Sequence, residues 1–212
     1  MKPKEWFRKT TWTESDQQDF FKRLGRARAS GRAQYLRIQA GHLEGAELLL
    51  QALELLDLLL RDYPDDLELA MAHLQKAHCL TKLGKEGEAI KAYQAVIQRE
   101  TEFPKTITDA WLDFGWFVVS RKLRNLYTEV LKVLSLPGRR LMFPIDHYRS
   151  HGIRAIIEEE KGNQMVAREF AIKAIAAANT KHSEFHYHKD VGLVSVSDSD
   201  VHAQLVRLAD KA

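Results

Sequence analysis

The sequence predicts an all-α fold, an array of about four antiparallel helix hairpins in tandem with a capping helix at each end. Apolar residues recur at spacings of three and four along most of the chain, which is the period of an amphipathic helix. Only 11 glycines and 5 prolines occur among 212 residues, so long loops should be rare. One pattern of small and apolar residues recurs roughly every 40 residues, which indicates a helical repeat protein.

Residues 1–32 are expected to form an aromatic-rich segment followed by a capping helix. The polar run at residues 14–16 suits a helix start. An apolar stripe follows, so the helix is expected over residues 15–29; the stripe comprises Phe20, Phe21, Leu24 and Ala27. Three aromatic side chains of the segment are expected to pack on the first hairpin, with exposure for a partner as the alternative: Trp6, Phe7 and Trp12.

The clearest hairpin lies between residues 70 and 103. Its two halves each place apolar residues on one helical face: Leu74, Ala77 and Leu80, then Ala89, Tyr93 and Val96. Gly84 stands between the halves, where a tight helix–helix turn needs a residue that tolerates a positive φ. The segment therefore predicts two antiparallel helices joined by a short turn.

This arrangement resembles a tetratricopeptide repeat (TPR), in which a small residue lets two helices approach and an aromatic fills the gap to the next hairpin. The small position recurs in register, because Ala40, Ala77, Gly115 and Ala155 lie 37, 38 and 40 residues apart. A run in the third copy is similar to the family's W-x-x-L-G-x-x-Y pattern: Trp111, Phe114, Gly115 and Val118. The resemblance implies a TPR-like α-solenoid over residues 33–178, with copies at approximately 33–66, 70–103, 108–136 and 148–178.

Three features depart from the family pattern. Glu47 stands where the first copy should carry its turn glycine, and Tyr127 occupies a small-residue position in the third copy. The period also exceeds the usual 34 residues of a TPR. Other two-helix repeats of about 40 residues therefore stay open as alternatives.

Residues 179–212 are expected to form a His-rich extended segment and a C-terminal capping helix. Ser197 and Asp200 suit the start of that helix, whose inner side would carry Val201, Leu205, Val206 and Leu208. Three histidines of the extended segment are weak metal-ligand candidates: His182, His186 and His188. Their spacing matches no zinc motif and the segment lacks cysteine, so structural or surface histidines are favoured and no cofactor is expected.

His147 and His151 form a second histidine pair. They are four residues apart and would share one face of a helix. A metal would need further ligands, which only specific folding could bring to them. Packing of the pair within the helical stack is therefore the favoured interpretation.

The TPR resemblance also implies a concave groove lined by the first helix of each hairpin. Its candidate partner-binding residues mix cationic, aromatic and apolar side chains: Arg37, Met71, Leu74, His78, Lys82, Asp109, Leu112, Trp116, Arg149 and Ile156. This mixture suits a protein or peptide that inserts anchor side chains. Gly41 stands where some family members need an Asn to clamp a C-terminal carboxylate, so that mode of binding is not favoured.

The leading functional hypothesis is a non-enzymatic protein- or peptide-binding module, either a bacterial adaptor or scaffold or an immunity-type inhibitor. Sequence signatures of common hydrolases, phosphate loops and zinc proteases are absent, so no enzyme is expected. One alternative is nucleic-acid binding through basic clusters, at residues 23–32 and 121–124. The net charge of only +3 does not favour it. A second alternative is a metal-binding protein or enzyme that uses the His-rich tail.

The remaining features indicate a soluble, cytoplasmic protein. The single cysteine, Cys79, cannot form an internal disulfide and lies at an apolar-periodic position, so a buried thiol is expected. Residues 1–10 carry no apolar run of the signal-peptide kind. Charged residues interrupt the longest apolar stretch, 46–60, so no membrane span is expected. A homodimer is compatible with the exposed ends of such an array.

Overall fold

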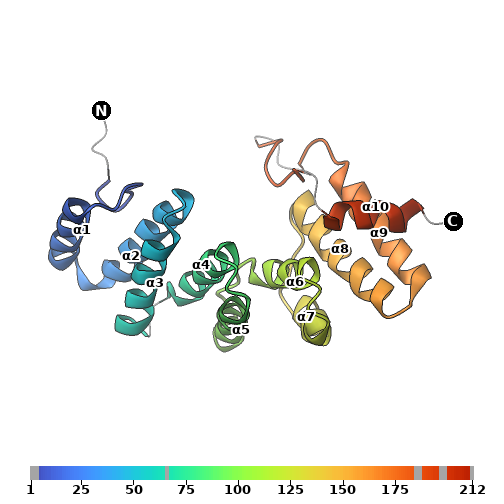
Figure 1. The fold of residues 1–212 in the computed structure, drawn as a ribbon, viewed down its shortest axis with the longest axis horizontal. Coiled ribbons are helices and arrows are strands. Elements are labelled where there is room, and N and C mark those ends of the chain that lie inside the picture. The colour runs from blue at the N-terminus through green and yellow to red at the C-terminus, as the bar shows by residue number, and fades with distance from the viewer. Residues whose placement is uncertain (1–4, 65–66, 184–187, 196–199, 211–212) are drawn as a thin grey trace. The chain divides into compact units, whose positions relative to one another are not determined.

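The secondary structure agrees with the all-α prediction. A computed structural model describes residues 5–64, 67–183, 188–195 and 200–210. Within these ranges the chain forms ten α-helices and one short 3₁₀ helix, and it forms no strand (Figure 1). None of the helices in those ranges is both long and apolar enough to cross a membrane. The chain divides into two compact units, Met1–Ala110 and Trp111–Ala212, and each is described by itself.

The first unit opens with α1 (Glu14–Arg26), whose start is fixed by a capping box. The N–H of Asp16 donates to the hydroxyl of Thr13 over 3.2 Å, and the N–H of Thr13 donates back to the Asp16 carboxylate over 3.0 Å. The hydrogen bond from the Thr13 backbone, together with the hydroxyls of Thr13 and Thr11, holds the pKa of Asp16 far below its usual range. The polar run at residues 14–16 therefore does start a helix, which ends at Arg26 and not at the expected residue 29.

The aromatic N-terminal segment attaches α1 to α2 (Ala29–Gly45). The ring centroid of Trp6 lies 5.3 Å from that of Phe20 on α1 and 5.0 Å from that of Tyr35 on α2. The buried side-chain amide of Gln39 accepts from the Lys9 N–H over 3.0 Å and donates to the Lys9 carbonyl over 2.7 Å. The expected packing of Trp6 against the first helices is therefore confirmed.

Consecutive helices of the first unit pack in pairs. Helix α2 contacts α3 (Leu49–Asp62), and α4 (Leu69–Lys82) contacts α5 (Glu86–Glu102), while α3 also packs on α4 (Figure 1). Each helix turns an apolar stripe inward. The largest fully buried side chains of these helices are leucines: Leu36, Leu43, Leu56, Leu59 and Leu80.

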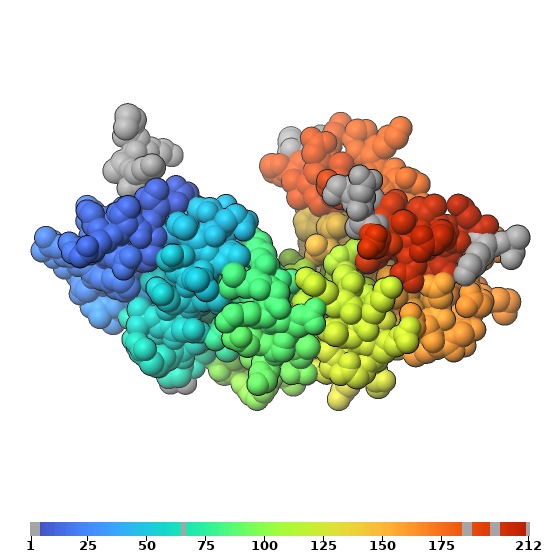
Figure 2. Space-filling model, viewed as in Figure 1, coloured from blue at the N-terminus to red at the C-terminus, as the bar shows by residue number. Residues whose placement is uncertain are grey.

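The second unit contains α6 (Ala110–Ser120), η1 (Arg124–Leu126), α7 (Tyr127–Leu134), α8 (Pro144–Glu160), α9 (Gln164–Ala178) and α10 (Asp200–Asp210). Helix α8 packs along α9, and α10, red in Figure 2, packs on α9 and on α8. Gly115 of α6 is buried where a Cβ atom would come within 2.7 Å of Ile153 and 3.2 Å of Val130. A small residue is therefore needed where α6, α7 and α8 meet.

Four helices end with the same hydrogen-bond geometry. After α2, α4, α6 and α8 comes a residue with positive φ: Glu47 (59°), Gly84 (71°), Lys122 (55°) and Gly162 (84°). In each case the next N–H bonds the carbonyl five residues earlier, which is a Schellman motif: Leu48 to Leu43 at 2.9 Å, Lys85 to Leu80 at 2.9 Å, Leu123 to Val118 at 3.0 Å and Asn163 to Glu158 at 2.9 Å. These motifs recur at intervals of 37, 38 and 40 residues, the same intervals as the small buried positions.

Exchanging residue types at two of these turns should change stability in opposite directions. Glu47→Gly should raise the free energy of unfolding by about 0.5–1 kcal/mol, because glycine adopts the left-handed conformation without strain. Gly84→Ala should lower it by about 1 kcal/mol, because a Cβ there meets no atom within 4 Å and only the backbone conformation is penalised. Urea denaturation followed by circular dichroism measures both changes.

The control for this pair is Gly87→Ala in the exposed first turn of α5, where φ is not positive and the Cβ is also unobstructed. That variant should be at least as stable as the wild type, since alanine favours a helix. Equal losses for Gly84→Ala and Gly87→Ala would contradict the conformational explanation.

The described part of the tail is anchored on the start of α8. The N–H of Ile145 donates to the Gly192 carbonyl over 2.8 Å. Gly192 has a φ of 71°, and a Cβ atom there would lie 2.4 Å from the Cβ of Phe143. The expected extended stretch at 191–196 forms no strand over its described residues, 191–195, because a turn at 189–192 leads into it.

The C-terminal helix is α10, and three of its four expected inner residues are buried: Val201, Leu205 and Leu208. The fourth expectation was wrong, because Val206 is 36% exposed and lies on the outer face of the helix. The expected cap residue Ser197 lies outside the described residues.

Candidate functional site

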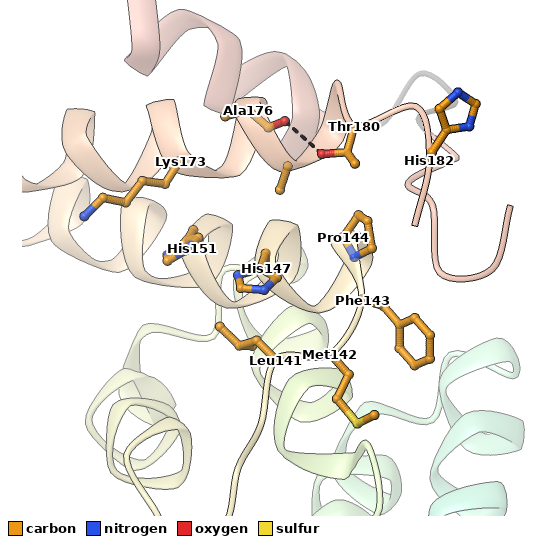
Figure 3. Close-up of a pocket in the computed structure, with 11 residues that line it drawn as sticks. Leu141, Met142, Phe143, Pro144, His147, His151, Lys173, Ala176, Thr180 and His182 are labelled. Atoms are coloured by element: carbon orange, nitrogen blue, oxygen red, sulfur yellow. Dashed lines mark hydrogen bonds between the residues drawn. The ribbon is translucent and has the colours of Figure 1, made fainter. Parts of the chain in front are cut away.

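A cavity of about 440 Å³ opens between α8 and α9 within the second unit (Figure 3). This volume falls in the range of pockets that bind small molecules or single side chains with their flanking backbone. Its walls come from the stretch before α8, from α8 and α9, and from the segment after α9: Leu141, Met142, Phe143, Pro144, His147, His151, Lys173, Ala176, Ala177, Thr180 and His182.

The apolar wall of the cavity is fixed by the start of α8. The carboxylate of Asp146 accepts hydrogen bonds from the N–H groups of Met142 (3.0 Å) and Phe143 (2.9 Å). Pro144 occupies the first turn, where a missing N–H costs nothing. These contacts hold residues 141–144 against the helix, so that their side chains line the cavity.

His147 and His151 lie on one face of α8, as their spacing predicted, with ring centroids 6.1 Å apart. The ring of His151 stacks on Phe170 of α9 at 6.0 Å. Its Nδ1 atom is buried and makes no hydrogen bond within the described part of the chain. Burial, and then the positive charges of neighbouring residues, lower the pKa of His151. His151 is therefore neutral at neutral pH and sits in a positively charged environment.

Helix α9 supplies the opposite wall. Ala176 and Ala177 leave room for a ligand, while the Thr180 hydroxyl donates to the Ala176 carbonyl over 3.4 Å. The ammonium of Lys173 lies 5.5 Å from the centroid of the Phe170 ring. In Figure 3, Lys173 and His182 stand at opposite ends of the cavity with the α8 histidines between them. None of the described lining residues carries a carboxylate, so the cavity combines apolar walls with cationic or protonatable groups.

The His-rich tail is only partly described. His182 lines the cavity, whereas His188 is exposed and His186 lies outside the described residues. The backbone of His188 instead serves structure, because its carbonyl accepts from the Ser183 hydroxyl over 2.9 Å. Among the residues that the structure describes, no three His, Cys, Asp or Glu side chains are grouped to hold a metal ion.

The groove candidates of the first unit are in part engaged within the chain. Arg37 forms an ion pair with Glu68, and Lys82 pairs with Glu44 at 3.3 Å and Glu47 at 3.5 Å. Leu74 is only 4% exposed and belongs to the core. The others retain accessible surface: Met71 and Asp109 are exposed, and His78 is half-buried against Tyr93.

In the second unit the groove candidates mostly pack internally. Leu112 and Ile156 are buried, and the guanidinium of Arg149 donates to Asp113 over 2.7 Å. Trp116 is half-buried, with its ring centroid 5.3 Å from that of Tyr148. Binding roles for these positions stay predictions. The buried ones have almost no surface to offer, because neighbouring helices cover them.

Several arginines of the basic clusters are also engaged. Arg23 pairs with Asp19 at 2.8 Å, and Arg124 pairs with Glu160 at 2.7 Å. Arg32 donates to the carbonyl of Gly25 over 2.8 Å at the end of α1. These contacts give the three side chains a structural explanation that needs no nucleic acid.

Cys79 is fully buried in α4, as its periodic position predicted. Burial raises the pKa of its thiol to about 12, with a further contribution from Glu44. The thiol is therefore protonated and unreactive at neutral pH.

Most of the cavity lining was not anticipated from the sequence. His147, His151 and His182 were recognised, but as two separate groups. Lys173, Ala176 and Ala177 were missed. The sequence does not distinguish these two alanines from the buried alanines of the same helix, Ala171 and Ala174.

No protein-family model, curated protein or solved structure matches this chain. The function of the cavity therefore has to be inferred from its own residues.

Proposed function

We propose that this chain is a non-enzymatic module that binds a protein or peptide, built from TPR-like helix hairpins. The repeated Schellman ends after α2, α4, α6 and α8 support such hairpins. So do the four buried small residues at the same intervals, Ala40, Ala77, Gly115 and Ala155. Arrays of this kind bury their cores between neighbouring helices and leave other helix faces available to partners.

The cavity between α8 and α9 is the observation that carries this proposal. Its apolar walls and few polar groups match the way an anchor side chain of a partner is held. The Thr180 hydroxyl is bonded to a backbone carbonyl, and the described lining pairs no nucleophile with a general base. Binding rather than catalysis is the function that these groups support.

Filling the cavity should abolish peptide binding. Ala176 is exposed on α9 and lines the cavity, so Ala176→Arg would occupy it without disturbing the core. Peptides selected from a random display library on the purified chain should bind this variant at least about tenfold more weakly than the wild type. Fluorescence anisotropy with the labelled peptides measures the difference.

The matched control is Ala203→Arg, the same substitution on an exposed alanine of α10 outside the cavity. It should leave the affinities within about twofold of the wild type. Failure to select any peptide, or equal binding to the two arginine variants, would refute the cavity as the binding site.

A further inference from the structure

Among the described residues that line the cavity, the charged and protonatable side chains are all basic. Lys173 on α9 and Arg154 on α8 are permanently cationic, and both lower the pKa of His151. His147 on α8 and His182 after α9 add two imidazole side chains, whose ring N–H groups can donate a hydrogen bond to an anion. No acidic side chain is among the described lining residues, although the Asp146 carboxylate accepts hydrogen bonds from the N–H groups of the lining residues Met142 and Phe143.

The apolar and basic side chains of the cavity lie next to each other along the chain. Leu141 and Phe143 stand before α8, whereas His147 and His151 follow one and two turns along the same helix. Lys173 lies across the cavity on α9 (Figure 3). A ligand that satisfies both groups must present an apolar side chain next to an anionic one.

We propose that the cavity recognises an acidic peptide segment, with the carboxylate of a Glu or Asp beside His147, His151 and Lys173 and an adjacent apolar side chain against Leu141 and Phe143. This inference rests on the proposed peptide-binding function and adds the chemistry of the partner. A carboxylate there meets the Lys173 ammonium and imidazole N–H donors, and hydrogen bonds to a charged group are stronger than those between neutral groups. The negative charge of the bound carboxylate also reduces the repulsion among the basic side chains around it.

The proposal has a pH dependence with a definite sign. The pKa of His151 is lowered by burial and then by neighbouring positive charges, so this imidazole takes up a proton, and adds positive charge beside the carboxylate, only as the pH falls below about 6.5. Affinity for an acidic segment should therefore rise by about three- to tenfold as the pH falls below this value. Lys173 remains charged throughout, so some preference for acidic segments should persist at the higher pH.

Two blocked peptide libraries test this inference on the full chain. Both carry randomised apolar positions around one fixed residue, which is Glu in the first library and Gln in the second. At about pH 6 the Glu library should bind the wild type about tenfold more tightly than the Gln library. Lys173→Met should shrink this ratio, while Lys173→Arg should preserve it, because Lys173 is exposed and either change is tolerated by the fold. His151→Asn should reduce the gain in affinity on acidification.

The possible outcomes separate this inference from the function on which it rests. Equal binding of both libraries, each abolished by Ala176→Arg, would leave a peptide-binding cavity and overturn only the acidic specificity. Absence of binding by either library would overturn both. Displacement of the Glu library by inorganic phosphate at a lower concentration than by unlabelled Glu peptide would overturn the peptide assignment in favour of a small anion.

Discussion

Replacing Phe114 by alanine is expected to lower the free energy of unfolding by about 3–5 kcal/mol. Phe114 is fully buried in α6, beside the glycine position where α6, α7 and α8 converge. Truncation removes a large apolar side chain and leaves a cavity that the helix backbones cannot close. Guanidinium denaturation followed by tryptophan fluorescence would measure the loss, and Trp111 and Trp116 lie on the same helix as reporters.

Met165→Ala is the matched control for this prediction. It also shortens an apolar side chain in the second unit, but Met165 is 84% exposed, so the change should stay within about 0.5 kcal/mol. A loss below about 1 kcal/mol for Phe114→Ala would mean that the junction of α6, α7 and α8 is not a packed core.

The second large effect is expected at Gly192. Gly192→Ala requires a left-handed alanine and places its Cβ 2.4 Å from that of Phe143, a distance that the backbone cannot accept without moving. The turn should therefore detach from α8, with a local cost of about 1–3 kcal/mol. Loss of the bond from the Ile145 N–H to the Gly192 carbonyl should speed hydrogen exchange at that amide by about tenfold or more.

Gly162→Ala separates the two causes of this effect. Gly162 also has a positive φ, but its Cβ would meet no atom within 4 Å, so that variant carries only the conformational penalty. Ile145 exchange in Gly162→Ala should match that of the wild type. Unchanged exchange in Gly192→Ala would show that the tail does not depend on close contact with Phe143. Because Phe143 also lines the cavity, selected peptides should bind Gly192→Ala more weakly.

The helices and their turns were accessible to sequence reasoning because they depend on local patterns. The three-four spacing of apolar residues located the paired helices, and Gly84 marked one of the turns. Glu47 and Lys122 adopt the same left-handed geometry without the expected glycine, since one such residue costs only about 1–2 kcal/mol. The sequence therefore carries no glycine signal at these two turns.

The cavity was less predictable because its residues meet through tertiary packing. His151 lies on α8 and His182 follows α9, and no local sequence pattern indicates that both side chains line the same cavity. The groove residues were also difficult to predict from the sequence, for a related reason. Leu74, Leu112 and Ile156 were assigned to the groove through the TPR resemblance, but they are buried, because whether a helix face is open depends on how the neighbouring helices cross.

The turns after α2, α4 and α8 have one more consequence, which concerns the order of folding. Three residues join each of these helices to the next, so the two members of a pair meet through a short chain closure. Loop-closure entropy is then small and most contacts form between neighbours in the sequence, which is the condition for rapid folding. During synthesis, α2 and α3 have all the residues for their mutual contact before α8 is translated. The chain can therefore acquire structure progressively from its N-terminus.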